Sequence, residues 1–138
     1  MTTGLWIVGA RGSVAACVAC GIAALRQQRA GTTGMVTAGP EFGSLGLVDP
    51  GDLVLAGTDI RSHTLAEAAA RLAHEGVVAH GLVEAAAPVL EEAESRIVDG
   101  YPTAADPRFE DLSPGARANA DLGAAGQIDA HAAAIDSF

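Results

Sequence analysis

The sequence contains no lysine, and its eight basic residues are all arginine. The absence of lysine excludes Schiff-base catalysis by this chain. With 17 acidic residues, the chain carries a formal net charge of −9. Such a charge repels the phosphates of nucleic acids and the headgroups of anionic lipids, so we expect neither nucleic acid nor a membrane as a partner.

Long apolar runs, aromatic residues and cysteines are also scarce. The longest uncharged apolar stretch, residues 12–25, is 14 residues long, whereas a membrane-spanning helix needs about 20. No basic region precedes the first apolar run, so we expect no signal peptide. Two cysteines form no disulfide framework, and we therefore expect a cytoplasmic protein. The abundant residues are small, with 30 alanines and 17 glycines in 138 residues. This composition suits closely packed helices and tight turns in one domain.

The first half of the chain alternates between strand and helix patterns. A fully apolar run at residues 5–8 predicts a buried parallel strand, followed by a tight turn at 9–12. Apolar residues at helical spacing predict a helix that begins at residue 13 and ends near residues 28–31. Two further strands are predicted at 33–37 and 53–56.

The second half is predicted to be mostly helical. Thr64 and Glu67 have the spacing of a capping box, which opens a helix that ends near Gly76. Another helix is predicted from residue 82 or 83 to 98, with Pro88 in or near its first turn. Residues 99–118 show no periodicity and are interpreted as a long loop.

Together these elements predict an α/β fold with a Rossmann-like parallel sheet, flanking helices and about three strands. We divide the chain into a Rossmann-like core (1–98), a Gly/Pro-rich loop (99–118) and a C-terminal helix leading to a missing strand (119–138). A nucleotide-binding half needs a strand beyond the point where strand order reverses. We therefore expect the chain to be a fragment or a truncated product.

The turn after the first strand has a spacing typical of phosphate binding. In a strand, Gly-x-x-Gly, helix unit, the first glycine permits the sharp turn and the second lets a pyrophosphate approach the helix N-terminus. Here Gly9, Gly12 and Ala15 are spaced three residues apart, which alters the usual G-x-G-x-x-G form. Arg11 adds a cation near the expected phosphates. The alternative is a purely structural connection. The residues expected to hold the pyrophosphate of a dinucleotide are Gly9, Ala10, Arg11, Gly12 and Ser13.

The usual acidic ligand of the adenosine ribose is not where the spacing requires it. That ligand lies about 20 residues beyond the glycines, at the end of the second strand, where this sequence has Thr37 and Ala38. Glu41 comes late and in a predicted loop. Asp59, just past the predicted third strand, is the candidate replacement, and an ordinary turn residue is the alternative interpretation.

Residues 5–15 (LWIVGARGSVA) resemble the cofactor-binding segment of myo-inositol-phosphate synthases, in their bacterial and archaeal-like branch. Residues 32–37, 45–49 and 81–97 are similar to later segments of that family, in the same order. Residues 54–60 (VLAGTDI) resemble its Gly-Gly-x-Asp-Ile segment, although Ala56 replaces a glycine. Cys17 and Cys20 stand where the family commonly has small residues such as Thr or Ala.

The resemblance implies an NAD-dependent isomerase that converts glucose 6-phosphate to inositol phosphate by oxidation, aldol cyclisation and re-reduction. It implies that Asp59 bonds a ribose hydroxyl and that Ile60 packs near the adenine. The family's catalytic lysines and sugar-phosphate site lie in a second domain, so no catalytic residue is assigned here. We expect the chain alone to be inactive, to bind the sugar phosphate only with that domain, and to form a homo-oligomer.

Two other interpretations stay open: a non-catalytic Rossmann remnant that serves as an interaction module, and the domain of another NAD(P)-dependent oxidoreductase. Cys17 and Cys20 are interpreted as packing residues, with a redox pair as the alternative, and no metal site is predicted. The four histidines are interpreted as surface or loop residues, and residues 91–94 as a solvated helix face.

Overall fold

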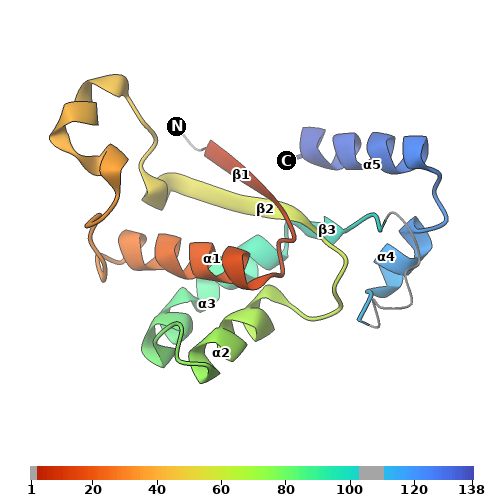
Figure 1. Ribbon diagram of the computed structural model, residues 1–138, viewed down its shortest axis with the longest axis horizontal. Coiled ribbons are helices and arrows are strands. Elements are labelled where there is room, and N and C mark those ends of the chain that lie inside the picture. The colour runs from red at the N-terminus through yellow and green to blue at the C-terminus, as the bar shows by residue number, and fades with distance from the viewer. Residues whose placement is uncertain (1–2, 103–110) are drawn as a thin grey trace.

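The computed structural model describes residues 3–102 and 111–138 (Figure 1). Its elements alternate between strand and helix over the first hundred residues and are helical after that. In chain order they are β1 (Thr3–Val8), α1 (Ser13–Arg26), the 3-10 helices η1 (Val36–Ala38), η2 (Pro40–Leu45) and η3 (Pro50–Asp52), β2 (Leu53–Asp59), α2 (Leu65–His74), α3 (His80–Glu94), β3 (Ile97–Asp99), α4 (Pro114–Asn119) and α5 (Ala124–Asp136).

The described residues form one three-stranded parallel sheet in the order β1-β2-β3. Leu5 pairs with Leu55 along the first ladder, and Thr58 pairs with Val98 along the second. Helices α1, α2 and α3 lie on one side of the sheet, and α5 lies on the other (Figure 1). This arrangement confirms the predicted fold class, an incomplete Rossmann-like α/β fold.

The core between the sheet and α1–α3 is built largely from alanine. Leu55 of β2, Leu65 of α2 and Leu90 of α3 contribute its large side chains. Four alanines of α1 are buried to 2% exposure or less: Ala15, Ala16, Ala19 and Ala23. Because alanine leaves little volume between backbones, α1 packs closely on the sheet and on α3.

The strand predicted at 33–37 is wrong. Gly34 has φ +88°, the Met35 amide donates to the carbonyl of Thr32, and a 3-10 turn begins at Val36. All five residues are exposed, and Val36 is 73% exposed. An apolar run becomes a stable strand only beside a partner, and here turns on both sides lead the segment away from the sheet. The strand that follows α1 in the fold is therefore β2.

The strand β3 was missed, because Ile97 continues the helical apolar spacing of the preceding residues. In the structure α3 ends at Glu94, and Ile97–Asp99 instead pairs with Gly57–Asp59. The start of this helix was also placed too late. Since α3 begins at His80, Pro88 lies inside it rather than in its first turn.

The predicted loop at 99–118 is partly wrong, because Asp99 belongs to β3 and α4 begins at Pro114. Ser113 caps α4 by accepting a hydrogen bond from the Ala116 amide, and Pro114 at the first position needs no donor there. Residues 103–110 of that predicted loop lie outside the described residues. A C-terminal helix is present as α5, and it begins at Ala124 rather than at residue 119. Within the residues described, no helix has the length and hydropathy needed to cross a bilayer.

Candidate functional site

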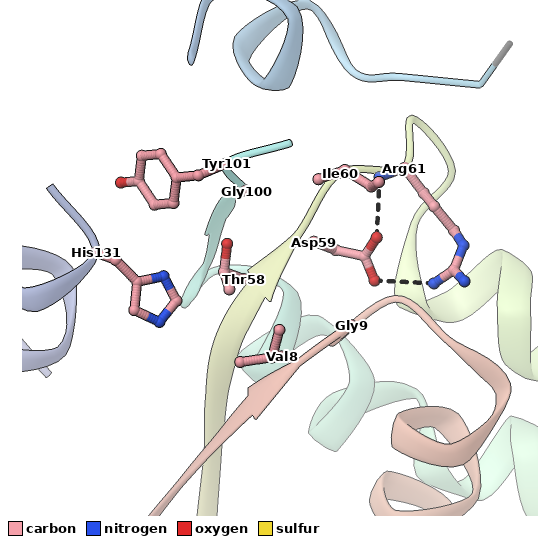
Figure 2. A pocket seen from close by; sticks show the side chains of 9 residues that line it. All are labelled: Val8, Gly9, Thr58, Asp59, Ile60, Arg61, Gly100, Tyr101 and His131. Carbon is pink, nitrogen blue, oxygen red and sulfur yellow. Dashed lines mark hydrogen bonds and ion pairs between the residues drawn. The ribbon is translucent and has the colours of Figure 1, made fainter. Parts of the chain in front are cut away.

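A cavity of about 410 Å³ lies where the carboxyl ends of all three strands meet (Figure 2). In parallel α/β sheets, ligands bind outside this edge of the sheet. We call it the edge cavity. Its lining comes from the ends of β1, β2 and β3 and from α5: Val8, Gly9, Thr58, Asp59, Ile60, Arg61, Gly100, Tyr101 and His131.

The glycine turn, residues 9–12, folds over the end of β2. The amides of Gly9 and Ala10 both donate to the Thr58 carbonyl, at 2.8 and 3.1 Å. Gly9 has φ +87°, a conformation that favours glycine. Gly12 has an ordinary φ of −83°, but a Cβ there would lie 3.0 Å from the Gly9 carbonyl oxygen. The first glycine is thus needed for conformation and the second for space within the turn.

Gly57 provides the close approach between β1 and β2. A Cβ at Gly57 would collide with the carbonyl oxygen of Ile7 and lie 2.8 Å from the Cβ of Ala10. The neighbouring Ala56, which departs from the family pattern, is accommodated as a buried residue opposite Trp6. The glycine that the fold requires in this segment is therefore present.

Asp59 is the last residue of β2, which is the second strand of the sheet. The position at which a ribose acid is expected is thus occupied, and only the long connection 27–52 displaced it in the sequence. Its side chain is 1% exposed. Oδ2 accepts from the Arg11 amide at 2.7 Å and from Nη1 of Arg61 at 3.2 Å, and Oδ1 accepts from the Arg61 amide at 2.9 Å. Asp59 therefore ties the glycine turn to the segment after β2, and its contact with a ribose stays a prediction.

The Arg11 side chain turns toward α3. Its Nε donates to Oε1 of Glu94 at 2.9 Å, Nη2 lies 2.9 Å from the same oxygen, and Nη1 donates to the Arg61 carbonyl at 3.1 Å. The other Glu94 oxygen accepts from the amide of Leu65, the first residue of α2, at 2.7 Å. The interpretation of 91–94 as a solvated face is therefore wrong for Glu94, while Glu91 and Glu92 are exposed.

Thr58, in the wall of the edge cavity, carries a buried hydroxyl without a described partner. The residue is 4% exposed, and no partner of its hydroxyl is found in the described part of the chain. Figure 2 shows the hydroxyl pointing toward Gly100 and Tyr101. A buried hydroxyl without a partner is rare in folded proteins, because the lost hydration is not replaced. Thr58 thus contributes to the cavity wall, and its hydroxyl is covered in this conformation without a described partner.

Two aromatic rings close the cavity on the side of α5. The rings of Tyr101 and His131 are 5.7 Å apart, and His131 lies 5.9 Å from Trp6. His131 and Tyr101 were not identified as site residues from the sequence. The sequence offered no signal for Tyr101, and for His131 only a histidine without an assigned role in a weakly predicted helix. The position of His131 depends on how α5 packs against the sheet.

The remaining candidate residues lie in different places around the glycine turn and along α1. Ile60 lines the edge cavity, whereas Ser13 begins α1 and is exposed. His63 lies in a loop, as predicted, but its side chain is only 17% exposed and its Nε2 lies 3.0 Å from the Arg11 carbonyl oxygen. Cys17 is exposed and Cys20 is buried, and burial raises the pKa of the Cys20 thiol. Residues 3–102 and 111–138 contain no group of three or more His, Cys, Asp or Glu that could hold a metal ion.

No model of a known protein family matches the sequence, and no curated protein matches it. The relationship to myo-inositol-phosphate synthases stays a hypothesis that depends on the residues quoted above.

Proposed function

We propose that this chain binds the adenosine half of NAD in the edge cavity, as the NAD-binding portion of an isomerase resembling myo-inositol-phosphate synthases. The observation that carries the proposal is a cavity at the carboxyl ends of three parallel strands, whose wall includes Thr58 with a buried hydroxyl that has no partner among the described residues. That edge is where dinucleotides bind in folds of this topology.

The size and lining of the cavity fit an adenosine. Ligand sites usually enclose about 300–1,000 Å³ and combine apolar walls with a few polar groups, and the edge cavity measures about 410 Å³. Ile60 and the ring of Tyr101 offer apolar surface to a purine, and Thr58 offers a hydrogen bond. The N-terminus of α1 at Ser13 has no side-chain cap and no acidic residue in its first turn, which favours a pyrophosphate beside it.

The proposed role of this chain in the reaction is to bind and orient the cofactor. The chemistry that NAD supplies when bound is reversible hydride transfer from and back to the sugar. The residues of the edge cavity would hold the adenosine end, and the glycine turn would hold the phosphates. The chain has no lysine to act as the general base of the cyclisation, so the chemistry would depend on the family's second domain.

An interaction module is the second candidate, and one observation favours it. Val8 and Val14, on either side of the glycine turn, are 76% and 77% exposed. Two exposed apolar side chains this close to the turn could be buried against a protein partner. In that case the turn would be a structural connection, and the same residues would bury against protein rather than nucleotide.

Calorimetric titration of NAD into the wild type, Thr58→Val and Thr58→Ser tests the proposal. Valine keeps the shape of threonine and removes its hydroxyl, whereas serine keeps the hydroxyl. We expect Thr58→Val to weaken binding about tenfold, since a hydrogen bond to the ligand is lost. The same variant should unfold at a higher temperature without ligand, because the unpartnered hydroxyl is gone, and Thr58→Ser should bind like the wild type. Absence of NAD binding by the wild type, or equal affinity of the valine variant, would contradict the proposal.

A further inference from the structure

Two free cysteines lie three residues apart on α1, at the boundary between its buried and exposed faces. Cys17 is exposed, whereas Cys20 is 1% exposed and belongs to the core between the sheet and α1–α3. Packing in the core accounts for Cys20 but not for Cys17, and the proposed function uses neither thiol. One thiol is thus open to reagents in solution, and its neighbour is shielded from them.

Helix geometry brings the two side chains within reach of a covalent bond. Residues three apart in an α-helix have Cα atoms about 5 Å apart, and a disulfide needs Cα atoms about 4.4–6.8 Å apart. Their Cβ atoms lie about 5–6 Å apart in a regular helix, whereas a disulfide needs about 3.5–4.5 Å. This turn of the helix must therefore shift by about 1 Å before a bond can form.

The two thiols also influence each other electrostatically. Burial is the larger cause that raises the pKa of the Cys20 thiol, and the charge of Cys17 raises it further. Such an effect weakens with distance, so the thiols are neighbours in the structure as well as in the sequence. A raised pKa and burial both slow the reaction of Cys20 with an oxidant. We therefore expect Cys17 to react first.

The exposed side of α1 can take up the required shift. Gly21 follows Cys20 directly, is exposed, and has no atom within 4 Å of the place where a Cβ would lie. Glycine is among the least favourable residues within a helix, so the hydrogen bonds of this turn are weakly held. Cys17 can thus move toward Cys20 while the alanines that pack against the sheet stay in place.

We propose that Cys17 and Cys20 form a reversible disulfide, and that Cys17 is the site that reacts with an oxidising low-molecular-weight disulfide. The Cys17 thiolate attacks one sulfur of the oxidant, which forms a mixed disulfide and releases one thiol. The Cys20 thiolate then attacks Sγ of Cys17, which forms the Cys17–Cys20 bond and releases the second thiol. The protein gives up two protons and two electrons, and these reduce the oxidant to two thiols.

The bond would serve as a switch rather than as a structural bridge. Strained disulfides are the ones that are easily reduced again, and this one forms only after the turn has shifted. In a reducing compartment, disulfides are usually transient and redox-sensing. A bond of this kind at Cys17 and Cys20 would follow the balance of thiols and disulfides around the protein.

The test is treatment of the reduced, folded chain with glutathione disulfide, followed by alkylation of the remaining thiols, digestion with trypsin and mass spectrometry. Trypsin cleaves after arginine, and both cysteines lie in the one peptide between Arg11 and Arg26. We expect the wild-type peptide to be unalkylated and lighter by two hydrogen atoms than the reduced peptide. Dithiothreitol should restore both thiols.

Two matched variants assign the roles of the cysteines. Cys20→Ala should stop at the glutathione adduct on Cys17, because the second thiol is missing. Cys17→Ala should react at least about tenfold more slowly than Cys20→Ala, since a thiol that is 1% exposed is reached only through local opening. Circular dichroism checks that each variant has the helical content of the wild type. The wild-type digest needs no variant, so it decides the matter even if Cys20→Ala does not fold.

Three results with the wild type would overturn the proposed bond: both thiols stay free, the reaction stops at a glutathione adduct, or Cys17 joins two copies of the chain. Equal reaction rates of Cys17→Ala and Cys20→Ala would overturn the assignment of Cys17 as the reacting site. None of these outcomes bears on the binding of NAD.

Discussion

Arg11 and Glu94, 83 positions apart in the sequence, are joined by a two-nitrogen contact to one carboxylate oxygen, at 2.9 Å from both Nε and Nη2. Through its second oxygen, Glu94 also binds the amide of Leu65 at the start of α2. A single carboxylate at the end of α3 therefore holds the glycine turn and the N-terminus of α2 in place. The edge cavity borders the glycine turn, which Glu94 holds through Arg11.

Glu94→Gln should destabilise the fold. The amide keeps an oxygen acceptor but loses the charge, and its NH₂ group faces the guanidinium or the Leu65 amide as a second donor. Charge-assisted hydrogen bonds that are partly shielded from water are worth about 1–3 kcal/mol, and we expect a loss in that range in urea unfolding. Glu91→Gln, an exposed neighbour on α3, is the control and should stay within about 0.5 kcal/mol of the wild type. Equal effects of the two substitutions would show that the Arg11–Glu94 contact contributes nothing.

Gly12→Val should abolish dinucleotide binding and leave the helical content largely intact. The φ of −83° at Gly12 is open to valine, but its Cβ would lie 3.0 Å from the Gly9 oxygen and 3.3 Å from Nη1 of Arg61. The turn must therefore open locally, at the place where the phosphates are expected. Circular dichroism measures the helix content and calorimetry the affinity. Gly21→Ala, where a Cβ meets nothing within 4 Å, is the control and should bind normally; unchanged affinity of Gly12→Val would reject the phosphate assignment.

Gly57→Ala should be among the most destabilising single-methyl additions in the chain. The new Cβ would collide with the Ile7 carbonyl oxygen and press on Ala10, and neither belongs to a flexible side chain. Adding a methyl to a packed core costs about 1–3 kcal/mol, and a clash with backbone puts this variant at or above the upper end. The thermal unfolding midpoint is the measurement, with Gly81→Ala as a control at an open helical position. A midpoint equal to that of the control would mean that β1 and β2 do not approach as described.

The capping box of α2 should give the fold a stability that depends on pH. Hydrogen bonds from the Thr64 backbone and hydroxyl lower the pKa of Glu67 below its usual value. Because the folded pKa is the lower one, the contribution of Glu67 is complete above the unfolded pKa, near pH 4, and is lost as the pH falls through the folded pKa. Glu67→Gln should therefore lower the unfolding midpoint at pH 7, and the gap to the wild type should narrow below pH 4. A gap that is constant from pH 7 to pH 3 would contradict this role.

The sequence predicted correctly those elements that are determined by residues close to one another in the chain. The capping box at Thr64 and Glu67 fixed the start of α2, and the apolar run at 5–8 with its glycine turn predicted β1 and the start of α1. The run at 33–37 has comparable apolar character but no strand beside it, and it forms turns instead. The three-residue β3 is too short to show a period of its own, so only its pairing with β2 reveals it.

Only those parts of the candidate site that lie next to a recognisable element were predicted from the sequence. The glycine turn and Asp59 were found because each directly follows an apolar strand. The bonds of Asp59 to Arg11 and Arg61, and the contact of Arg11 with Glu94, join segments 2 to 83 residues apart. The unpartnered Thr58 hydroxyl and the placement of His131 depend on how α5 and the segment after β3 cover the sheet. No spacing rule contains that information.

Amide chemical-shift mapping during a titration with NAD tests the central claim most directly, since it locates the ligand as well as detecting it. The account predicts saturable shifts at the carboxyl ends of the three strands, at Gly9, Thr58, Ile60 and Tyr101, with smaller changes along β1 toward Thr3. Shifts confined to the outer face of α5 around Ile128, or none at NAD concentrations that saturate ordinary dinucleotide sites, would contradict the assignment of the edge cavity.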